Sequence, residues 1–153
     1  MQSQIDQTAV NQSGLYDEDF FEWTRRNAEL LRAGLLDQAD IEHIAEEIED
    51  IGKRDLKELN RRVQVLTQHL LQWQLQPEKK SRSWARTIAS RRNELAQCLE
   101  DSPSLRVKIR PNLGPNYQKA ILLAVIDTGL PKTHFPAECP FTVDQILDPE
   151  FLP

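Results

Sequence analysis

Long apolar runs are missing from this sequence. The longest, AILLAVI, covers only residues 120–126, whereas a helix that spans a bilayer needs about 18 or more apolar residues. The first residues, MQSQIDQTAVNQSG, also lack the basic and apolar regions of a secretory signal. We therefore expect a cytoplasmic protein that does not use a membrane.

Cysteine and glycine are scarce as well. The chain has two cysteines, Cys98 and Cys139, and their number and spacing match neither a disulfide framework nor a zinc site. We expect two free thiols in a reducing compartment. With 5 glycines, 39% hydrophobic and 28% charged residues, the composition is typical of a compact globular protein. A length of 153 residues suits one domain with one core.

Charge is distributed unevenly along the chain, although the net value is only −5. Residues 17–50 contain 12 acids and 3 bases, whereas residues 51–92 contain 3 acids and 11 bases. Such asymmetry indicates either an external partner of opposite charge or pairing between two parts of the same fold. We favour internal pairing.

Apolar residues recur in steps of three and four over about residues 40–75, which predicts one long helix with a single apolar face. Gly52 and Asp55 interrupt this pattern, so a bend near residues 52–55 is the alternative to a continuous helix. We call the apolar face the seam, and it consists of Ile41, Ile44, Ile48, Ile51, Leu59, Val63, Leu66, Leu70 and Trp73.

One further helix is predicted before the long helix in the sequence, and another is predicted after it. The first begins where Asp17 can cap it and ends near Gly34. The second has Ser83 as its cap and runs from Trp84 to about Glu100.

The remainder of the chain is rich in proline. Ser102 and the proline after it indicate another helix start, but prolines and a glycine over residues 111–115 are expected to interrupt that helix. A last substantial helix is expected over about residues 116–127. Four prolines after residue 135 predict an irregular tail across the bundle, with a short helix capped by Thr142 and Gln145.

These patterns together predict an all-α fold, a helical bundle around one long helix with an irregular proline-rich C-terminal tail. We expect a disordered segment at residues 1–14 and a single helical domain at residues 15–153.

Four polar side chains at helical spacing raise the question of a metal or acid–base site: His43, Glu46, Glu47 and Asp50. Carboxylate-bridged metal bundles need a second helix with its own Glu-x-x-His pair, and the sequence has none. Acid–base pairs four residues apart favour a solvated, self-paired helix face instead. These pairs are Glu49 with Lys53, Asp50 with Arg54, and Glu58 with Arg62.

His69 stands among apolar residues in LTQHLLQWQL, where we expect a core histidine with satisfied nitrogens. No serine or cysteine nucleophile stands in a recognisable setting near it. A metal-dependent hydrolase that uses Glu46, Glu47 and His69 remains an alternative, and it requires a break near Gly52 or a dimer. We predict no catalytic residue, no metal ligand and no cofactor.

A basic segment at residues 79–92 is the basis of a second alternative, association with nucleic acid. Basic side chains next to aromatic ones can bind phosphates and stack bases. The candidate positions are Trp73, Arg82, Trp84 and Arg86. A sequence pI of about 5.2 argues against a dedicated nucleic-acid binder.

Seven motifs in a fixed order resemble a family that is abundant in cyanobacteria and known as domain of unknown function number 29. The resemblance covers residues 16–149 and implies an α-helical domain from a bacterium, with no established activity. The chain departs from the family pattern at Gln72, where lysine is common, and at Pro111 and Pro115. The motifs are YDEDFFEW (16–23), LLRAG (30–34), AEEIEDIG (45–52), HLLQWQ (69–74), SWARTI (83–88), SPSL (102–105) and CPFTVDQILDP (139–149).

The function that the sequence favours is therefore a non-catalytic protein–protein interaction module. We expect a protein partner or self-association through the seam, because a long helix in a small domain can extend beyond its own core.

Overall fold

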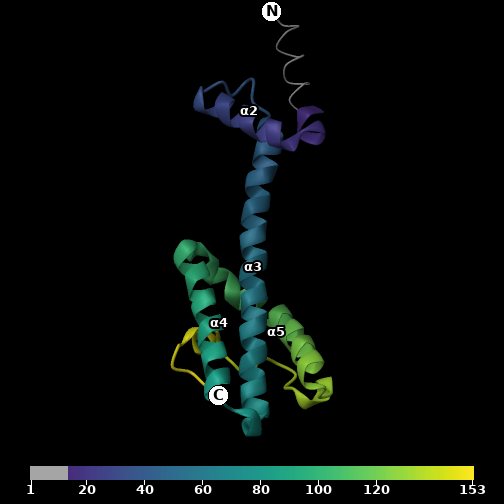
Figure 1. Cartoon of the computed structure of the whole chain (residues 1–153), viewed down its shortest axis with the longest axis vertical. Coiled ribbons are helices and arrows are strands. Elements are labelled where there is room, and N and C mark those ends of the chain that lie inside the picture. The colour runs from purple at the N-terminus through teal and green to yellow at the C-terminus, as the bar shows by residue number, and fades with distance from the viewer. Residues whose placement is uncertain (1–13) are drawn as a thin grey trace, which may run out of the picture. The chain divides into compact units, whose positions relative to one another are not determined.

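The computed structural model describes residues 14–153, which form helices and turns without any strand (Figure 1). This confirms the predicted all-α fold. Residues 1–13 of the predicted disordered segment lie outside the described part. The chain divides into two compact units, Met1–Arg54 (unit 1) and Asp55–Pro153 (unit 2). The expectation of a single domain stays a prediction.

Unit 1 contains a short helical stretch at residues 14–18, helix α2 (Phe20–Arg32) and the first part of helix α3 (Ile41–Leu75). The predicted cap at Asp17 is wrong, because that residue lies within the preceding helical stretch. Asp19 caps α2 instead, and its Oδ1 accepts a hydrogen bond of 3.0 Å from the backbone N–H of Glu22. The chain leaves α2 at Gly34 as predicted, with a φ of 72° that favours glycine.

The long helix is confirmed as α3, which contains 35 residues and continues through Gly52. No break interrupts the helix over residues 52–55, and the alternative of a bend there stays a prediction. A glycine inside a helix costs only about 1 kcal/mol relative to alanine. That is too little to break a long helix when the neighbouring residues are ordinary helix formers and no proline is present.

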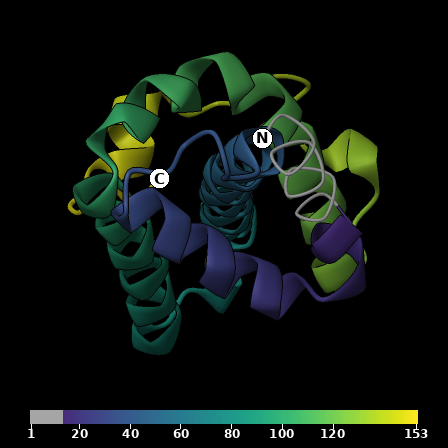
Figure 2. The same cartoon turned by 90° about the horizontal axis from the view of Figure 1, so that it is seen from above.

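Unit 2 packs its helices around the second part of α3. In Figures 1 and 2, α4 and α5 lie on different sides of α3. The elements that come after α3 are the 3-10 turn η1 (Pro77–Lys79), α4 (Arg82–Asp101), η2 (Pro103–Leu105), α5 (Arg106–Thr128), η3 (Lys132–His134) and α6 (Val143–Leu147). Among the described residues, no helix is both long enough and apolar enough to cross a membrane.

The core of unit 2 is built on the second half of the seam. Each residue of this half except Trp73 has no solvent exposure, so that side of α3 is fully covered. The core side chains are Leu59, Val63, Leu66, Leu70 and Leu71 from α3, Ile88 and Leu95 from α4, Ile109, Tyr117, Ala120, Ile121 and Ala124 from α5, and Phe135, Phe141 and Ile146 from the C-terminal part.

Helix α4 begins two residues earlier than predicted. Its cap is Ser81 and not Ser83, because the Ser81 Oγ accepts a hydrogen bond of 3.1 Å from the backbone N–H of Trp84. Ser102 begins the 3-10 turn η2 and makes no side-chain cap. The predicted capping box of α6 is confirmed, since the side chains of Thr142 and Gln145 each accept a hydrogen bond from the other residue's backbone N–H.

The prolines at 111 and 115 do not interrupt the helix that contains them, so the predicted break over residues 111–115 is wrong. Helix α5 includes both prolines. Both are exposed, and therefore water can bind the carbonyl groups that lose their helical N–H partners. The opposite side of α5 is buried and holds the helix against the core.

The C-terminal segment is attached to α4 by one buried guanidinium group. Arg92 is only 5% exposed, and burial lowers its pKa. Its Nε donates to the carbonyl of Ile146 at 2.8 Å, and its Nη2 donates to the carbonyl of Phe151 at 3.0 Å. A third donor, Nη1, lies 3.5 Å from the carbonyl of Pro149. Arg92 therefore belongs to the core and not to a basic surface.

We predict that Arg92→Met lowers the free energy of unfolding by about 1.5–3 kcal/mol, because it removes charged donors and leaves buried carbonyls without partners. Urea denaturation of the whole chain measures this change. The matched control is Arg86→Met on the same helix, where an exposed side chain should give a change within about 0.5 kcal/mol. Equal effects of the two substitutions would contradict the anchoring role of Arg92.

Candidate functional site

A polar cluster in unit 1 joins the helical stretch at residues 14–18, α2 and α3. Asp40 Oδ2 accepts two hydrogen bonds, from Trp23 Nε1 at 3.0 Å and from His43 Nδ1 at 2.7 Å. The Tyr16 ring stacks on the His43 ring with centroids 3.9 Å apart, and its hydroxyl donates to Glu47 Oε1 at 2.7 Å. His43 and Glu47 are therefore not part of a fully solvated face, contrary to our expectation.

These contacts change the proton affinities of two side chains. The hydrogen bond to Asp40 raises the pKa of His43, although partial desolvation opposes this change. The hydrogen bond to Glu47 raises the pKa of Tyr16 to about 12, because a tyrosinate would lose that bond and face a carboxylate. The cluster is a structural contact that holds Tyr16 and Trp23 against α3.

Neither of the two ion pairs predicted for the first half of α3 is formed. Lys53 pairs with Asp50 at 3.1 Å instead of with Glu49. Within residues 14–153, Glu49 and Arg54 form no ion pair, so the predicted pairing of each is wrong. Glu46 is exposed.

Three of the four isoleucines in the first half of the seam are exposed and Ile44 is half-buried, in contrast to the second half. Ile41 is 46% exposed, Ile48 is 64% exposed and Ile51 is 52% exposed. At about 100° per residue, Ile41 and Ile48 lie on a different side of α3 from the residues that contact Tyr16, and Ile51 lies between the two sides. The residues before α3 therefore cover one side of the helix and leave the side of Ile41 and Ile48 open. We define the isoleucine face as Ile41, Ala45, Ile48, Ile51 and Gly52, all of them exposed.

A second apolar face lies on α5 in unit 2. Val107 is 73% exposed, Leu122 is 53% exposed and Ile126 is 81% exposed. With the two prolines of the helix they occupy an arc of roughly 120° on the side opposite to the core. Two exposed lysines, Lys108 and Lys119, lie along one edge of that arc. We define the outer α5 face as Val107, Pro111, Pro115, Leu122 and Ile126.

Unit 2 also contains a polar pocket of about 410 Å³. It lies where the C-terminal ends of α3 and α5 meet the N-terminal end of α4. Two of our sequence candidates, His69 and Trp84, are in its wall. Its lining consists of His69, Gln72, Gln76, Lys79, Ser81, Ser83, Trp84, Thr87, Asp127 and Thr128.

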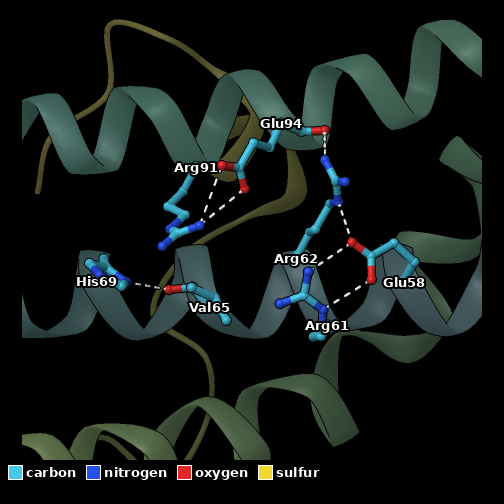
Figure 3. Close-up of polar contacts among 7 residues, drawn as sticks. All are labelled: Glu58, Arg61, Arg62, Val65, His69, Arg91 and Glu94. Atoms are coloured by element: carbon cyan, nitrogen blue, oxygen red, sulfur yellow. Dashed lines mark hydrogen bonds and ion pairs between the residues drawn. The ribbon is translucent and has the colours of Figure 1, made fainter.

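His69 is half-buried at this pocket and is not enclosed in the core as we expected. Its Nδ1 donates to the carbonyl of Val65 at 2.7 Å (Figure 3). When Nδ1 carries the proton, Nε2 of a neutral imidazole is a hydrogen-bond acceptor. One nitrogen is thus satisfied within the helix and the other is available to the pocket.

The bases beside His69 on α3 are paired within unit 2. Glu58 accepts hydrogen bonds from Arg61 at 2.8 Å and from Arg62 at 2.8 Å, so the predicted pair with Arg62 is confirmed. Arg62 also donates to the carbonyl of Glu94 on α4 at 2.6 Å, and Arg91 pairs with the Glu94 carboxylate at 3.2 Å (Figure 3). Of these three arginines, Arg62 joins α3 to α4, whereas Arg61 and Arg91 pair within their own helices.

The aromatic candidates contact each other at the same end of unit 2. The rings of Trp73 and Trp84 are 5.7 Å apart in an edge-to-face arrangement, and Lys80 Nζ lies 5.1 Å from the centre of the Trp73 ring. Arg82 and Arg86 are exposed on α4 and form no ion pair within the part of the chain that the structure describes.

The candidates for a metal-dependent hydrolase belong to different units. Glu46 and Glu47 lie in unit 1, and His69 lies in unit 2. Among the described residues there is no group of three or more His, Cys, Asp or Glu side chains that could hold a metal ion.

Two features of these sites were not predicted from the sequence. Trp23 and Asp40 are 17 positions apart, so helical periodicity gives no indication of their contact. Gln72 and Gln76 did leave a signal, because they are four residues apart and so share one face of a helix end that also carries Leu70, Leu71 and Trp73. Polar residues on a buried helix face indicate either an internal network or a pocket.

We predict that Tyr16 ionises at a pKa of about 12, and that Glu47→Gln brings this pKa down toward its ordinary value. An absorbance titration at alkaline pH measures tyrosinate formation. Because burial raises the pKa of Tyr117 to about 12 as well, the titration should be made in a Tyr117→Phe background. An unchanged pKa in the Glu47→Gln variant would show that Glu47 is not the cause.

We predict that unit 2 loses stability as the pH falls from 4.5 toward about 2, because hydrogen bonds from Arg61 and Arg62 lower the pKa of Glu58 from 4.5 to about 2. Between these values the unfolded chain takes up a proton at Glu58 and the folded chain does not, so acid favours unfolding. In Glu58→Gln this part of the pH dependence should disappear, as thermal melts at several pH values would show. Glu100→Gln, which changes an exposed carboxylate on α4, should keep it.

Comparison with known proteins gives one match. No curated protein and no solved structure matches this chain. One family model matches residues 15–152, which include nearly all of the described part of each unit, and this confirms the resemblance that the seven motifs indicate. The chain therefore belongs to the family described as Domain of unknown function DUF29.

Proposed function

We propose that this protein is a non-catalytic interaction module that self-associates. In this proposal the isoleucine face of one copy docks against the outer α5 face of a second copy. The observation that carries the proposal is the division of the seam: its second half is covered by α4 and α5, while Ile41, Ile48 and Ile51 remain open to solvent.

The first argument is the apolar area of the two faces. Full burial of one isoleucine or valine side chain contributes about 1.5–3 kcal/mol, and an exposed row of such side chains is a common sign of an interaction surface. Ile48 is the most exposed of the three isoleucines, and Ile126 is more exposed than Val107 and Leu122. Burial of the Ile48 and Ile126 side chains in a contact would remove a large apolar surface from water.

The second argument is shape. Between the isoleucines stand Ala45 and Gly52, the smallest side chains available to a helix, and both are exposed. A Cβ atom added at Gly52 would meet nothing within 4 Å, so the space beside the helix is open. A second helix can approach closely at such positions and bring the flanking isoleucines into contact.

The third argument is charge. Glu42 and Glu49 lie along one edge of the isoleucine face, and Lys108 and Lys119 lie along one edge of the outer α5 face. Unit 1 contains 13 acids and 5 bases, whereas unit 2 contains 14 bases and 11 acids. Opposite charge around the two faces favours their pairing. Two isoleucine faces in contact would instead bring acidic edges together.

Each copy carries both faces, and this determines the kind of assembly to expect. A contact between two different faces can repeat from copy to copy. The assembly is a closed ring or pair when the last copy binds the first one, and an open chain otherwise. The acidic and basic parts of the chain, which we expected to pair within one copy, would then pair between two copies.

We predict a reversible, concentration-dependent assembly in sedimentation velocity and light scattering, weaker at high salt because the edge charges are screened. Ile48→Glu and Ile126→Glu should each raise the dissociation constant by at least about tenfold, which corresponds to about 1.4 kcal/mol. The matched control is Phe21→Glu, which changes a 78% exposed apolar side chain outside both faces. It should leave the assembly unchanged.

A charge exchange tests whether the two faces contact each other. Glu49→Lys alone and Lys119→Glu alone should weaken the assembly, and the double variant should recover part of the loss. A strict monomer at high concentration would refute self-association. Assembly that tolerates both glutamate substitutions on the apolar faces would refute these faces as the interface.

A further inference from the structure

We propose that the polar pocket of unit 2 binds a small nucleotide whose base carries an exocyclic amine, of which an adenine nucleotide is the simplest example. This site is separate from the two apolar faces and independent of self-association. The proposal rests on a largely buried glutamine whose amide faces the pocket without a partner, an aromatic wall, and lining groups of opposite polarity.

Gln76 is the observation that indicates a ligand. The residue is only 8% exposed, it lines the pocket, and its side chain makes no hydrogen bond within residues 14–153. The amide atoms of Gln76 are not among the fully buried ones, so a ligand in the pocket can reach them and replace the water there. A glutamine side chain presents a donor and an acceptor side by side, and adenine matches them with N7 and the N6 amine.

Trp84 supplies an aromatic wall for the base. It is half-buried, and its edge-to-face contact with Trp73 at 5.7 Å fixes the orientation of the ring. Stacking of a base on an aromatic side chain stabilises many protein–nucleotide contacts without selecting the base. In this pocket the selection would come from the amide of Gln76.

One end of the pocket is suited to a phosphate. Ser81 and Ser83 belong to the N-terminus of α4, a helix of 20 residues with no acidic residue in its first turn. The N-terminus of a helix carries a partial positive charge and unpaired N–H groups, which bind phosphate oxygens. Lys79 also lines the pocket and forms no ion pair within the described part of the chain.

The other end is suited to an amine. Asp127 Oδ2 accepts a hydrogen bond of 2.6 Å from Gln72 Nε2, so its carboxylate is held in place while Oδ1 remains available. His69 Nε2 adds a second acceptor, because Nδ1 donates to Val65. A carboxylate and a neutral imidazole nitrogen accept hydrogen bonds from an amine and oppose an additional anion.

The size and polarity of the pocket fit this ligand class. A volume of about 410 Å³ lies within the range of small-molecule sites, which is about 300–1,000 Å³. A neutral sugar would leave Lys79 and the N-terminus of α4 without an anion. A free nucleotide and the end of a nucleic-acid strand present the same chemistry, and the experiment separates these two sources.

Calorimetric titration of the whole protein with adenosine monophosphate tests the proposal. We expect saturable binding with one site per chain. Uridine monophosphate lacks the amine and adenosine lacks the phosphate, so each should bind roughly tenfold more weakly. Inorganic phosphate alone should bind more weakly still. Absence of saturable adenosine monophosphate binding at millimolar concentration would overturn the proposal, and so would phosphate binding of equal strength.

Variants assign the binding to the pocket. Gln76→Leu and Lys79→Ala should each weaken adenosine monophosphate binding by about tenfold. Lys79 is exposed, so its variant tests the site even if Gln76→Leu is less stable. The matched control is Arg86→Ala, an exposed base on α4 outside the pocket lining, which should leave binding unchanged. Binding that neither pocket substitution weakens would overturn the proposal.

A short single strand of oligoadenylate identifies the source of the nucleotide. Binding that is tighter than that of adenosine monophosphate, and that both pocket variants weaken, would support the end of a nucleic acid as the ligand. Equal or weaker binding would support a free nucleotide. Oligoadenylate binding that depends on Arg82 and Arg86 but not on Gln76 would overturn the pocket as the site. Ile48→Glu should bind adenosine monophosphate normally, which separates this site from self-association.

Discussion

Burial of one face of α3 is the interaction on which the rest of unit 2 depends. Leu59, Val63, Leu66 and Leu70 have no exposure because α4, α5 and the C-terminal segment all pack against them. Such a core holds the ends of three helices together, and the polar pocket lies where those ends meet. Charged side chains serve the same packing: Arg62 connects α3 to α4, and Arg92 connects α4 to the C-terminal segment.

Unit 1 is stabilised differently, and this difference creates the exposed face. Its helices meet through a tyrosine, a tryptophan, a histidine and two carboxylates, which form hydrogen bonds and ring contacts. Polar contacts of this kind cover the side of α3 that carries His43 and leave the isoleucines in water. The acidic character of unit 1 and the basic character of unit 2 would favour the contacts between copies that we propose.

Periodicity was sufficient to predict the helical fold, the long helix and the capping box of α6, because each depends on residues close in sequence. Periodicity placed the helix caps less well. Asp17 and Asp19 are both suitable caps for α2, and Ser81 and Ser83 are both suitable caps for α4, so the sequence does not show which one stands first outside the helix. The prolines in α5 were misleading because their effect depends on exposure to water. The pocket and the Asp40 cluster join residues distant in sequence, and one chain without its structure does not indicate such contacts.

The most direct test of the two-face contact is cross-linking between copies. A photo-reactive amino acid in place of Glu49 lies at the edge of the isoleucine face, and a mixture of isotopically heavy and light chains distinguishes cross-links between copies from those within one copy. Docking of the two faces predicts heavy–light cross-links from position 49 to residues 106–128, which form α5. Heavy–light cross-links confined to residues 41–51 of the second copy, or a complete absence of them, would contradict it.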